Sequence, residues 1–188
     1  GHGYEFVASF EGGIMKELKE PFGADANNTT SGVSETEKSG SLVSSFVESF
    51  YAETQMPVVA VSCSKGGTPI EFWDTDGAAY QDAVNRLEYA RNFIEEDESM
   101  NLAHTYVVWC QGETDAENNT SVDEYKDTMA RIFDGFSTSG VEQTFVIGTG
   151  SYNGTVGGID TSMDSIREAQ KEFCEDNETA TYLSGMFE

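Results

Sequence analysis

The sequence is poor in positive charge. Of its 188 residues, 10 are Lys or Arg and 34 are Asp or Glu, which gives a formal net charge of −24. A surface this acidic repels nucleic acid and anionic membranes, so we expect neither as a partner. The apolar runs are all shorter than the roughly 20 residues that span a bilayer, and no charged-then-apolar signal segment opens the chain. We therefore expect a soluble protein, secreted or cytoplasmic, whose oligomeric state stays open.

Cysteine and histidine are scarce as well. The three cysteines, Cys63, Cys110 and Cys174, are an odd number without metal-ligand spacing, so we expect neither a disulfide framework nor a metal site. Of the two histidines, His2 is in the first three residues, and His104 precedes a predicted strand at the amino end of the sheet. Neither is placed to act as a catalytic base. The sequence predicts no metal and no other cofactor.

One stretch organises the chain, Tyr106-Val-Val-Trp-Cys-Gln-Gly-Glu-Thr-Asp115. Its first five residues predict a short strand buried on both faces, as in a parallel sheet. The polar residues that follow lie past the carboxyl end of this strand, where ligands bind in open α/β sheets. Gly112 permits a tight turn there, and Gln111 brings an amide donor. The alternative is a strand that runs into an ordinary polar turn.

A second stretch has the same form. Residues 57–63 predict another buried strand, which runs into Gly66-Gly67-Thr68. Periodicity predicts further helices and strands in alternation. The expected helices cover residues 40–51, 80–94, 121–136 and 162–175, and the expected strands cover residues 58–63, 106–110, 144–148 and 179–183. Ser121 and Glu124 fit a capping box. Alternation at this spacing predicts an α/β fold with a parallel sheet and helices on both faces.

The start of the chain fits this sheet less well. Tyr4 to Phe10 predicts a short strand or hairpin arm that turns at Gly12-Gly13. It is short and half polar, and we do not expect it to fill the middle of a sheet.

The two turns together resemble those of one family. Gly66-Gly67-Thr68 and Trp109–Asp115 are similar to motifs of the SGNH-type hydrolases, in the branch that contains carbohydrate esterase family 6 and the sialate O-acetylesterase domain. Ile166–Gln170 resembles the family's Arg-x-Ala-Gln element, and Gly3–Phe6 resembles the segment shortly after its nucleophile. The resemblance covers nearly the whole chain. It implies one domain over residues 1–188, a three-layer sandwich whose parallel sheet has flavodoxin-like order.

The resemblance also implies a function, the serine-dependent removal of acetyl groups from a glycan such as acetylxylan or acetylated sialic acid. In the family, the turn's backbone N–H and the glutamine amide donate hydrogen bonds to the oxyanion. Here these groups belong to Gly67, together with Gly66, and to Gln111. Glu113 matches a carboxylate that supports the catalytic histidine, or it holds the loop's N–H groups as a buried carboxylate. The competing class is a non-catalytic carbohydrate-binding or interaction module that retains the fold.

Four further residues have less specific patterns. Trp73 is expected either as an apolar wall for the bound sugar or acetyl group, or as a core residue. Asp115 is expected to be structural, for example in an Asx turn. Arg167 and Gln170 are one helical turn apart and share a face. We expect a salt bridge or a hydrogen bond at the edge of the core from this pair.

No residue of the chain matches the family's serine or histidine. In the resembled family, the serine follows a central first strand and the histidine lies near the carboxyl terminus. Gly1 is already past the first position, and Glu188 precedes the second. We therefore expect the first strand and a catalytic segment outside these residues, or another segment that completes the sheet. The strands at 58–63 and 106–110 are expected to flank that central strand, with their turns on one edge.

Overall fold

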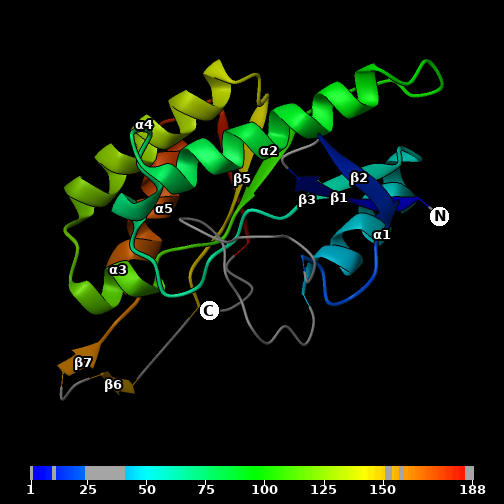
Figure 1. Ribbon diagram of the computed structural model, residues 1–188. Coiled ribbons are helices and arrows are strands. Elements are labelled where there is room, and N and C mark those ends of the chain that lie inside the picture. The colour runs from blue at the N-terminus through cyan, green and yellow to red at the C-terminus, as the bar shows by residue number, and fades with distance from the viewer. Residues whose placement is uncertain (1, 10–11, 24–40, 151–153, 157–158, 185–188) are drawn as a thin grey trace. The chain divides into compact units, whose positions relative to one another are not determined.

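A computed structural model describes residues 2–9, 12–23, 41–150, 154–156 and 159–184 (Figure 1). The chain separates into two compact units, Gly1–Gly66 with Asp82–Leu102 and Gly67–Gln81 with Ala103–Glu188. Helices and strands alternate, so the predicted α/β class is confirmed. Within the described residues, the strands pair in three small sheets instead of the single sheet that was predicted. In each three-stranded sheet, all the strands belong to one unit.

The first unit contains the sheet β2-β1-β3. Its elements are β1 (Gly3–Ser9), β2 (Gly12–Glu17), α1 (Val43–Thr54), β3 (Val58–Val61) and α2 (Ala78–Glu95), whose first residues belong to the second unit. β1 and β2 form the predicted antiparallel hairpin, but its predicted turn was wrong, because Gly12 and Gly13 are the first residues of β2 and pair with Ser9 and Ala8. Phe10, the last residue predicted for its first arm, lies outside the described residues.

β1 occupies the middle of this sheet, because it also runs parallel to β3. The expectation that this segment was too polar for such a place was wrong. Glu5, its charged residue, is 2% exposed. The Glu5 carboxylate accepts a hydrogen bond from the Gly23 N–H at 2.9 Å and pairs with the Lys16 ammonium at 3.4 Å. A buried charge is tolerated when it is paired and hydrogen-bonded in this way.

The second unit contains the parallel sheet β4-β5-β8 and a separate hairpin, β6-β7. Its remaining elements are helical, and α4 and α5 lie side by side (Figure 1). In chain order the elements are η1 (Ile70–Trp73), β4 (Tyr106–Trp109), α3 (Glu113–Asn118), α4 (Val122–Thr138), β5 (Gln143–Ile147), β6 (Gly154–Val156), β7 (Ile159–Thr161), α5 (Asp164–Glu175) and β8 (Ala180–Ser184). The predicted elements all form, whereas η1, α3, β6 and β7 were not predicted.

The core of the second unit lies around α4. Its inward side chains recur at helical spacing and are almost fully buried, namely Tyr125, Met129, Ile132, Phe133 and Phe136. Trp109 at the end of β4 packs edge-to-face against the ring of Phe133, with 5.6 Å between ring centroids. The helix begins as predicted, because the Ser121 hydroxyl accepts a hydrogen bond from the Glu124 N–H.

β4 is less buried than its sequence suggested. Alternate side chains of a strand point to opposite faces, and Tyr106 and Val108, which share one face, are each 39% exposed. Trp109, on the other face, is 7% exposed. The prediction of a strand buried on both faces was therefore wrong for β4. Its apolar run reflects one packed face and the aromatic contact of Tyr106 with Phe145 of β5.

Glu20 joins the start of α1 to the chain before it. Its carboxylate accepts hydrogen bonds from the Ser41 hydroxyl at 2.9 Å, the Ser44 hydroxyl at 2.6 Å and the Phe22 N–H at 3.0 Å. Burial opposes ionisation, but these hydrogen bonds and one from the Ser44 N–H outweigh it and lower the pKa of Glu20 to about 2. Ser44 lies in the first turn of α1, where a negative charge also interacts favourably with the helix dipole.

This arrangement makes stability depend on pH. The pKa of Glu20 is lower in the folded than in the unfolded chain, so its contribution is present above about pH 4.5 and is lost as the pH falls to about 2. We expect Glu20→Gln to lower the free energy of unfolding at pH 7 and to lose this difference from wild type near pH 2. Urea unfolding across this range measures it. Glu53→Gln, at an exposed site on α1, is the control, and an equal effect in both variants would contradict the assignment.

Candidate functional site

Gly112 turns the chain sharply from β4 into α3. Its φ is +137°, which L side chains rarely adopt. A Cβ atom at this position would lie 2.6 Å from Cγ2 of Thr149 and 2.8 Å from Cγ2 of Ile166. The predicted tight turn is present, and the absence of a side chain lets it approach the end of β5 and the start of α5 closely.

The Gln111 side chain connects the two motif-bearing turns. Its amide Nε2 donates to the Thr68 carbonyl at 3.1 Å and to Oδ2 of Asp115 at 2.5 Å. Its Oε1 accepts from the Tyr125 hydroxyl at 3.1 Å. Thr68 of the Gly-Gly-Thr turn and Gln111 of the Gln-Gly-Glu turn are thus in direct contact, and both belong to the second unit. Both N–H groups of the amide are donated inside the protein, and the Gln111 residue is 9% exposed.

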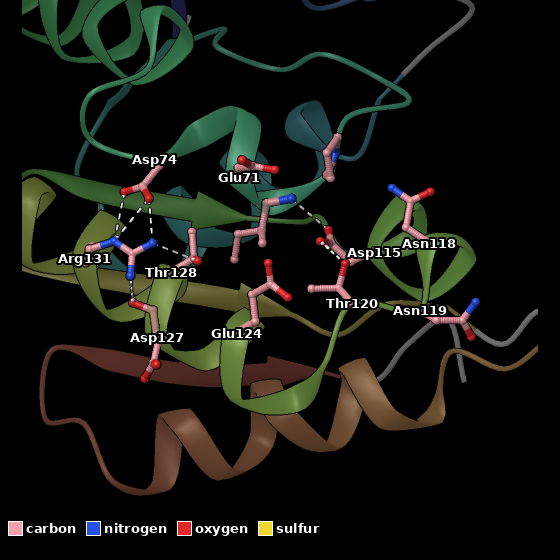
Figure 2. A pocket seen from close by; sticks show the side chains of 12 residues that line it. Glu71, Asp74, Asp115, Asn118, Asn119, Thr120, Glu124, Asp127, Thr128 and Arg131 are labelled. Atoms are coloured by element: carbon pink, nitrogen blue, oxygen red, sulfur yellow. Dashed lines mark hydrogen bonds and ion pairs between the residues drawn. The ribbon is translucent and has the colours of Figure 1, made fainter.

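Asp115 is the central acceptor of this site. It is 1% exposed, and its carboxylate accepts hydrogen bonds from the Ile70 N–H at 2.9 Å and from the Thr120 hydroxyl at 3.1 Å (Figure 2). It also accepts one from the Gln111 amide. Burial raises the pKa of Asp115, and the hydrogen bonds offset only part of that effect. The expected structural role is confirmed, but instead of an Asx turn it depends on donors from η1, from the turn after β4 and from Thr120 after α3.

Glu113 is exposed, in the first turn of α3. The alternative that Glu113 is a buried carboxylate holding the loop was therefore wrong. Asp115, two residues later on the helix, points inward and has that role. Support of a catalytic histidine by Glu113 stays a prediction.

The Gly-Gly turn is accessible. Gly66 and Gly67 are both exposed. Gly67 has a φ of +70°, and a Cβ atom there would meet no other atom within 4 Å. A molecule can therefore approach the Gly67 backbone closely, which an oxyanion donor requires. Oxyanion binding by either glycine stays a prediction.

Trp73 lies in the core of the second unit. It is 7% exposed, its Nε1 donates to the Thr68 hydroxyl at 3.0 Å, and its ring packs edge-to-face against Trp109. These contacts fit the core alternative and hold the Thr68 turn from a second side. A role as a wall of the substrate site stays a prediction.

The Arg-x-Ala-Gln element of α5 is structural, as expected. Arg167 pairs with Asp164 one turn earlier. Gln170 is 0% exposed and donates to the Gln111 carbonyl at 2.7 Å. Its contact with the turn after β4 is a buried hydrogen bond that the sequence pattern did not specify.

A polar pocket of about 670 Å³ opens beside Asp115 (Figure 2). Arg131 donates to Asp74 across it at 2.6 Å, and this contact holds the pKa of Asp74 below its ordinary value. Acidic, amide and hydroxyl side chains predominate among the lining residues, which are Pro69, Ile70, Glu71, Asp74, Asp115, Asn118, Asn119, Thr120, Glu124, Asp127, Thr128 and Arg131. Sequence reasoning missed this pocket, because its residues come from η1, α3, α4 and the residues that adjoin them.

Comparison with known proteins identifies the family. Residues 9–182 match the family model described as carbohydrate esterase, sialic acid-specific acetylesterase. The chain belongs to this esterase family. The predicted SGNH-type resemblance is thereby confirmed, because the matched residues include both motifs. A comparison with curated proteins found no match.

A solved structure supports the fold of this member of the carbohydrate esterase family. The X-ray structure of a protein from Arabidopsis thaliana is similar to it, with a TM-score of 0.67 and 19% sequence identity. The similarity covers 95% of this chain and 67% of the Arabidopsis chain. At this identity the likeness concerns the fold alone.

Two features are absent from the part of the chain that the structure describes. No group of three or more His, Cys, Asp or Glu side chains there could hold a metal ion. No helix there is both long and apolar enough to cross a membrane. The three cysteines are free thiols.

The two positive-φ glycines of the esterase motifs predict contrasting substitutions. We expect Gly112→Ala to lower the free energy of unfolding by about 2–5 kcal/mol, from backbone strain and overpacking together. Gly67→Ala meets open space, and we expect a loss of only about 1–2 kcal/mol from its left-handed backbone. Urea unfolding of both variants measures the contrast. Equal losses would show that Thr149 and Ile166 do not confine the turn at Gly112.

Asp115 gives a second pair of variants. Asp115→Ala leaves buried donors without an acceptor, and we expect a loss of about 1–3 kcal/mol at pH 7. Asp115→Asn retains an acceptor oxygen toward Ile70 and Gln111, so a smaller loss is expected.

The pH dependence has a definite sign. The folded pKa of Asp115 is raised, so its contribution is present below its unfolded pKa of about 3.9 and is lost as the pH rises through the folded value. The stability of Asp115→Asn relative to wild type should therefore increase between about pH 3 and pH 7. A constant difference over this range, measured by urea unfolding, would contradict the burial effect.

Proposed function

We propose that this protein removes O-acetyl groups from carbohydrate by acyl transfer to a serine and then to water. The Gly67 backbone N–H and the Gln111 amide would donate to the oxyanion of the acyl-transfer step. The observation that carries the proposal is the 3.1 Å hydrogen bond from Gln111 to the Thr68 carbonyl. It joins the family's two motifs in one rigid turn pair, within a chain of the carbohydrate esterase family.

The chemistry of the two groups supports this role. An oxyanion requires preorganised donors at about 2.7–3.1 Å. An amide donor is neutral and needs no particular protonation state. In this structure Gln111 donates to the Thr68 carbonyl, a neutral acceptor. An anionic oxygen is a stronger acceptor, so the tetrahedral intermediate would replace the Thr68 carbonyl as the acceptor of that N–H group.

The substrate class follows from the family. O-acetylated sialic acid is the first candidate, because the description of the family names sialic acid, and acetylated xylan is the second. The proposal assigns neither the nucleophilic serine nor its base to a residue of this chain. Gln111 and Gly67 would stabilise the negative charge that develops on the oxyanion, which is one part of the reaction.

One observation favours a second candidate, a non-catalytic carbohydrate-binding module. Both N–H groups of the Gln111 amide are already donated within the protein. If Thr68 is never displaced, the two motifs hold the turns and have no part in catalysis.

Acetate release from the two substrates, together with labelling by a serine-directed phosphonate, separates the candidates. The esterase should release acetate and react with one equivalent of phosphonate. Mass spectrometry of the labelled protein then identifies the nucleophile. Binding of the acetylated sugar without acetate release or labelling would overturn the esterase proposal in favour of the module.

The role of Gln111 has its own prediction. Loss of one oxyanion donor typically lowers kcat by about 10²–10³, and we expect this for Gln111→Ala with an aryl acetate. Gln143→Ala removes an exposed amide from β5 and should leave kcat unchanged. A kcat of Gln111→Ala within about threefold of wild type, well below the usual loss, would exclude Gln111 as a donor.

A further inference from the structure

The function proposed above makes no use of Gln170, although this side chain is fully buried. Its Oε1 accepts a hydrogen bond from the Thr149 N–H at 3.2 Å. Its Nε2 donates to the Gln111 carbonyl at 2.7 Å and to the Tyr125 hydroxyl at 3.0 Å. A polar side chain with this many buried bonds has a specific orientation.

The backbone fixes the orientation of the Gln170 amide. The Thr149 N–H can only donate and the Gln111 carbonyl can only accept. Gln170 must therefore present its oxygen to Thr149 and its NH₂ group to Gln111 and Tyr125. In a flipped amide, the NH₂ group would face the Thr149 N–H, donor against donor, and the oxygen would face the Gln111 carbonyl, acceptor against acceptor.

The orientation of the Gln170 amide in turn fixes the direction of the Tyr125 O–H bond. It has one proton, and it accepts from Gln170. Its proton is therefore directed at Gln111, whose Oε1 lies at 3.1 Å and whose backbone carbonyl lies at 3.2 Å. Burial raises the pKa of the Tyr125 hydroxyl, so it keeps the proton at neutral pH.

Two acceptors on the other side of the Gln111 amide favour the same orientation of its side chain. Oδ2 of Asp115 and the Thr68 carbonyl both accept from its Nε2. A reversed amide would bring its oxygen against these two acceptors and its NH₂ group toward the proton of Tyr125. The hydrogen bonds from Thr149 through Gln170 and Tyr125 thus favour the same orientation of the Gln111 amide as the two acceptors, Asp115 and Thr68.

We propose that Tyr125 and Gln170 are positioning residues, which orient the Gln111 amide so that its N–H groups face the Gly67–Thr68 turn. The expected effect of these residues on kcat rests on the proposed function. The orientation itself is a property of the folded chain and can be measured without substrate. Asp115 and Thr68 hold the donor end of the amide, and Tyr125 holds its oxygen end.

The first measurement is the solvent exchange of side-chain amide protons in ¹⁵N-glutamine-labelled protein, which has five glutamines. In the wild type, the Gln111 and Gln170 NH₂ groups should exchange at least about tenfold more slowly than that of Gln143, whose hydrogen bond is exposed. Tyr125→Phe should increase the exchange rate of the Gln111 group by about threefold to tenfold. Tyr89→Phe, at a 42% exposed site, is the matched control and should change nothing.

A second variant covers the case in which Tyr125→Phe does not fold. Gln170→Glu has nearly the same shape but, once ionised, cannot donate to Tyr125, so the hydroxyl should turn toward the Glu carboxylate and release Gln111. Gln143→Glu is its control. Fast exchange of the wild-type Gln111 amide, or unchanged exchange in a folded variant, would overturn the positioning role.

Kinetics then separate positioning from a merely structural role. Tyr125→Phe should lower kcat for an aryl acetate by about 10–100-fold with KM within about twofold, the pattern of an interaction made in the transition state. In the Gln111→Ala background it should lower kcat no further, because Tyr125 acts through Gln111. Multiplicative losses would overturn the inference.

The two failures are distinguishable. If Gln111→Ala keeps full kcat, or if no esterase activity exists, the donor role fails and amide exchange alone decides the positioning role. If Gln111→Ala loses activity while Tyr125→Phe changes neither amide exchange nor kcat, the positioning role fails and the proposed function stands.

Discussion

The Asp115 carboxylate is the interaction on which the candidate site depends. Ile70, Gln111 and Thr120 belong to three segments of the second unit, and each donates to this one side chain. A carboxylate can accept several hydrogen bonds at once, which a hydroxyl or an amide oxygen does less well. Its burial is costly, and the donors that surround it offset part of that cost. The two motif-bearing turns therefore keep their relative position through a charge that has no direct role in the proposed chemistry.

The order of the elements could be predicted because periodicity and turn residues are local signals. The amphipathic pattern of 121–136 and the cap at Ser121 depend on neighbours a few residues apart, and α4 forms nearly where the pattern put it. The burial of β4 could not be predicted, because an apolar run does not reveal how many faces other elements cover. Nor could the middle place of β1, since the partners of Glu5 come from β2 and from a distant Gly23.

The candidate site was predictable in part for the same reason. Gly112 and Gln111 were recognisable from a contiguous motif, which lies within the residues that the family model matches. Tyr125 looks like one more apolar residue of a helix, and nothing near it in the sequence marks its hydroxyl as a hydrogen-bond partner of Gln111. The choice between Glu113 and Asp115 depends on which face of α3 turns inward, and six residues carry too little periodicity to decide that.

The aromatic contact between Trp73 and Trp109 makes the protein's fluorescence selective. These are the only two tryptophans in the sequence, and both belong to the second unit. Each is 7% exposed, with 6.2 Å between their ring centroids, so their emission should be blue-shifted in the folded state. Indole emission therefore reports the integrity of the second unit, which carries Gln111, and does not report that of the first unit. Circular dichroism observes helices of both units, and a difference between the two melting curves would reveal that the units unfold separately.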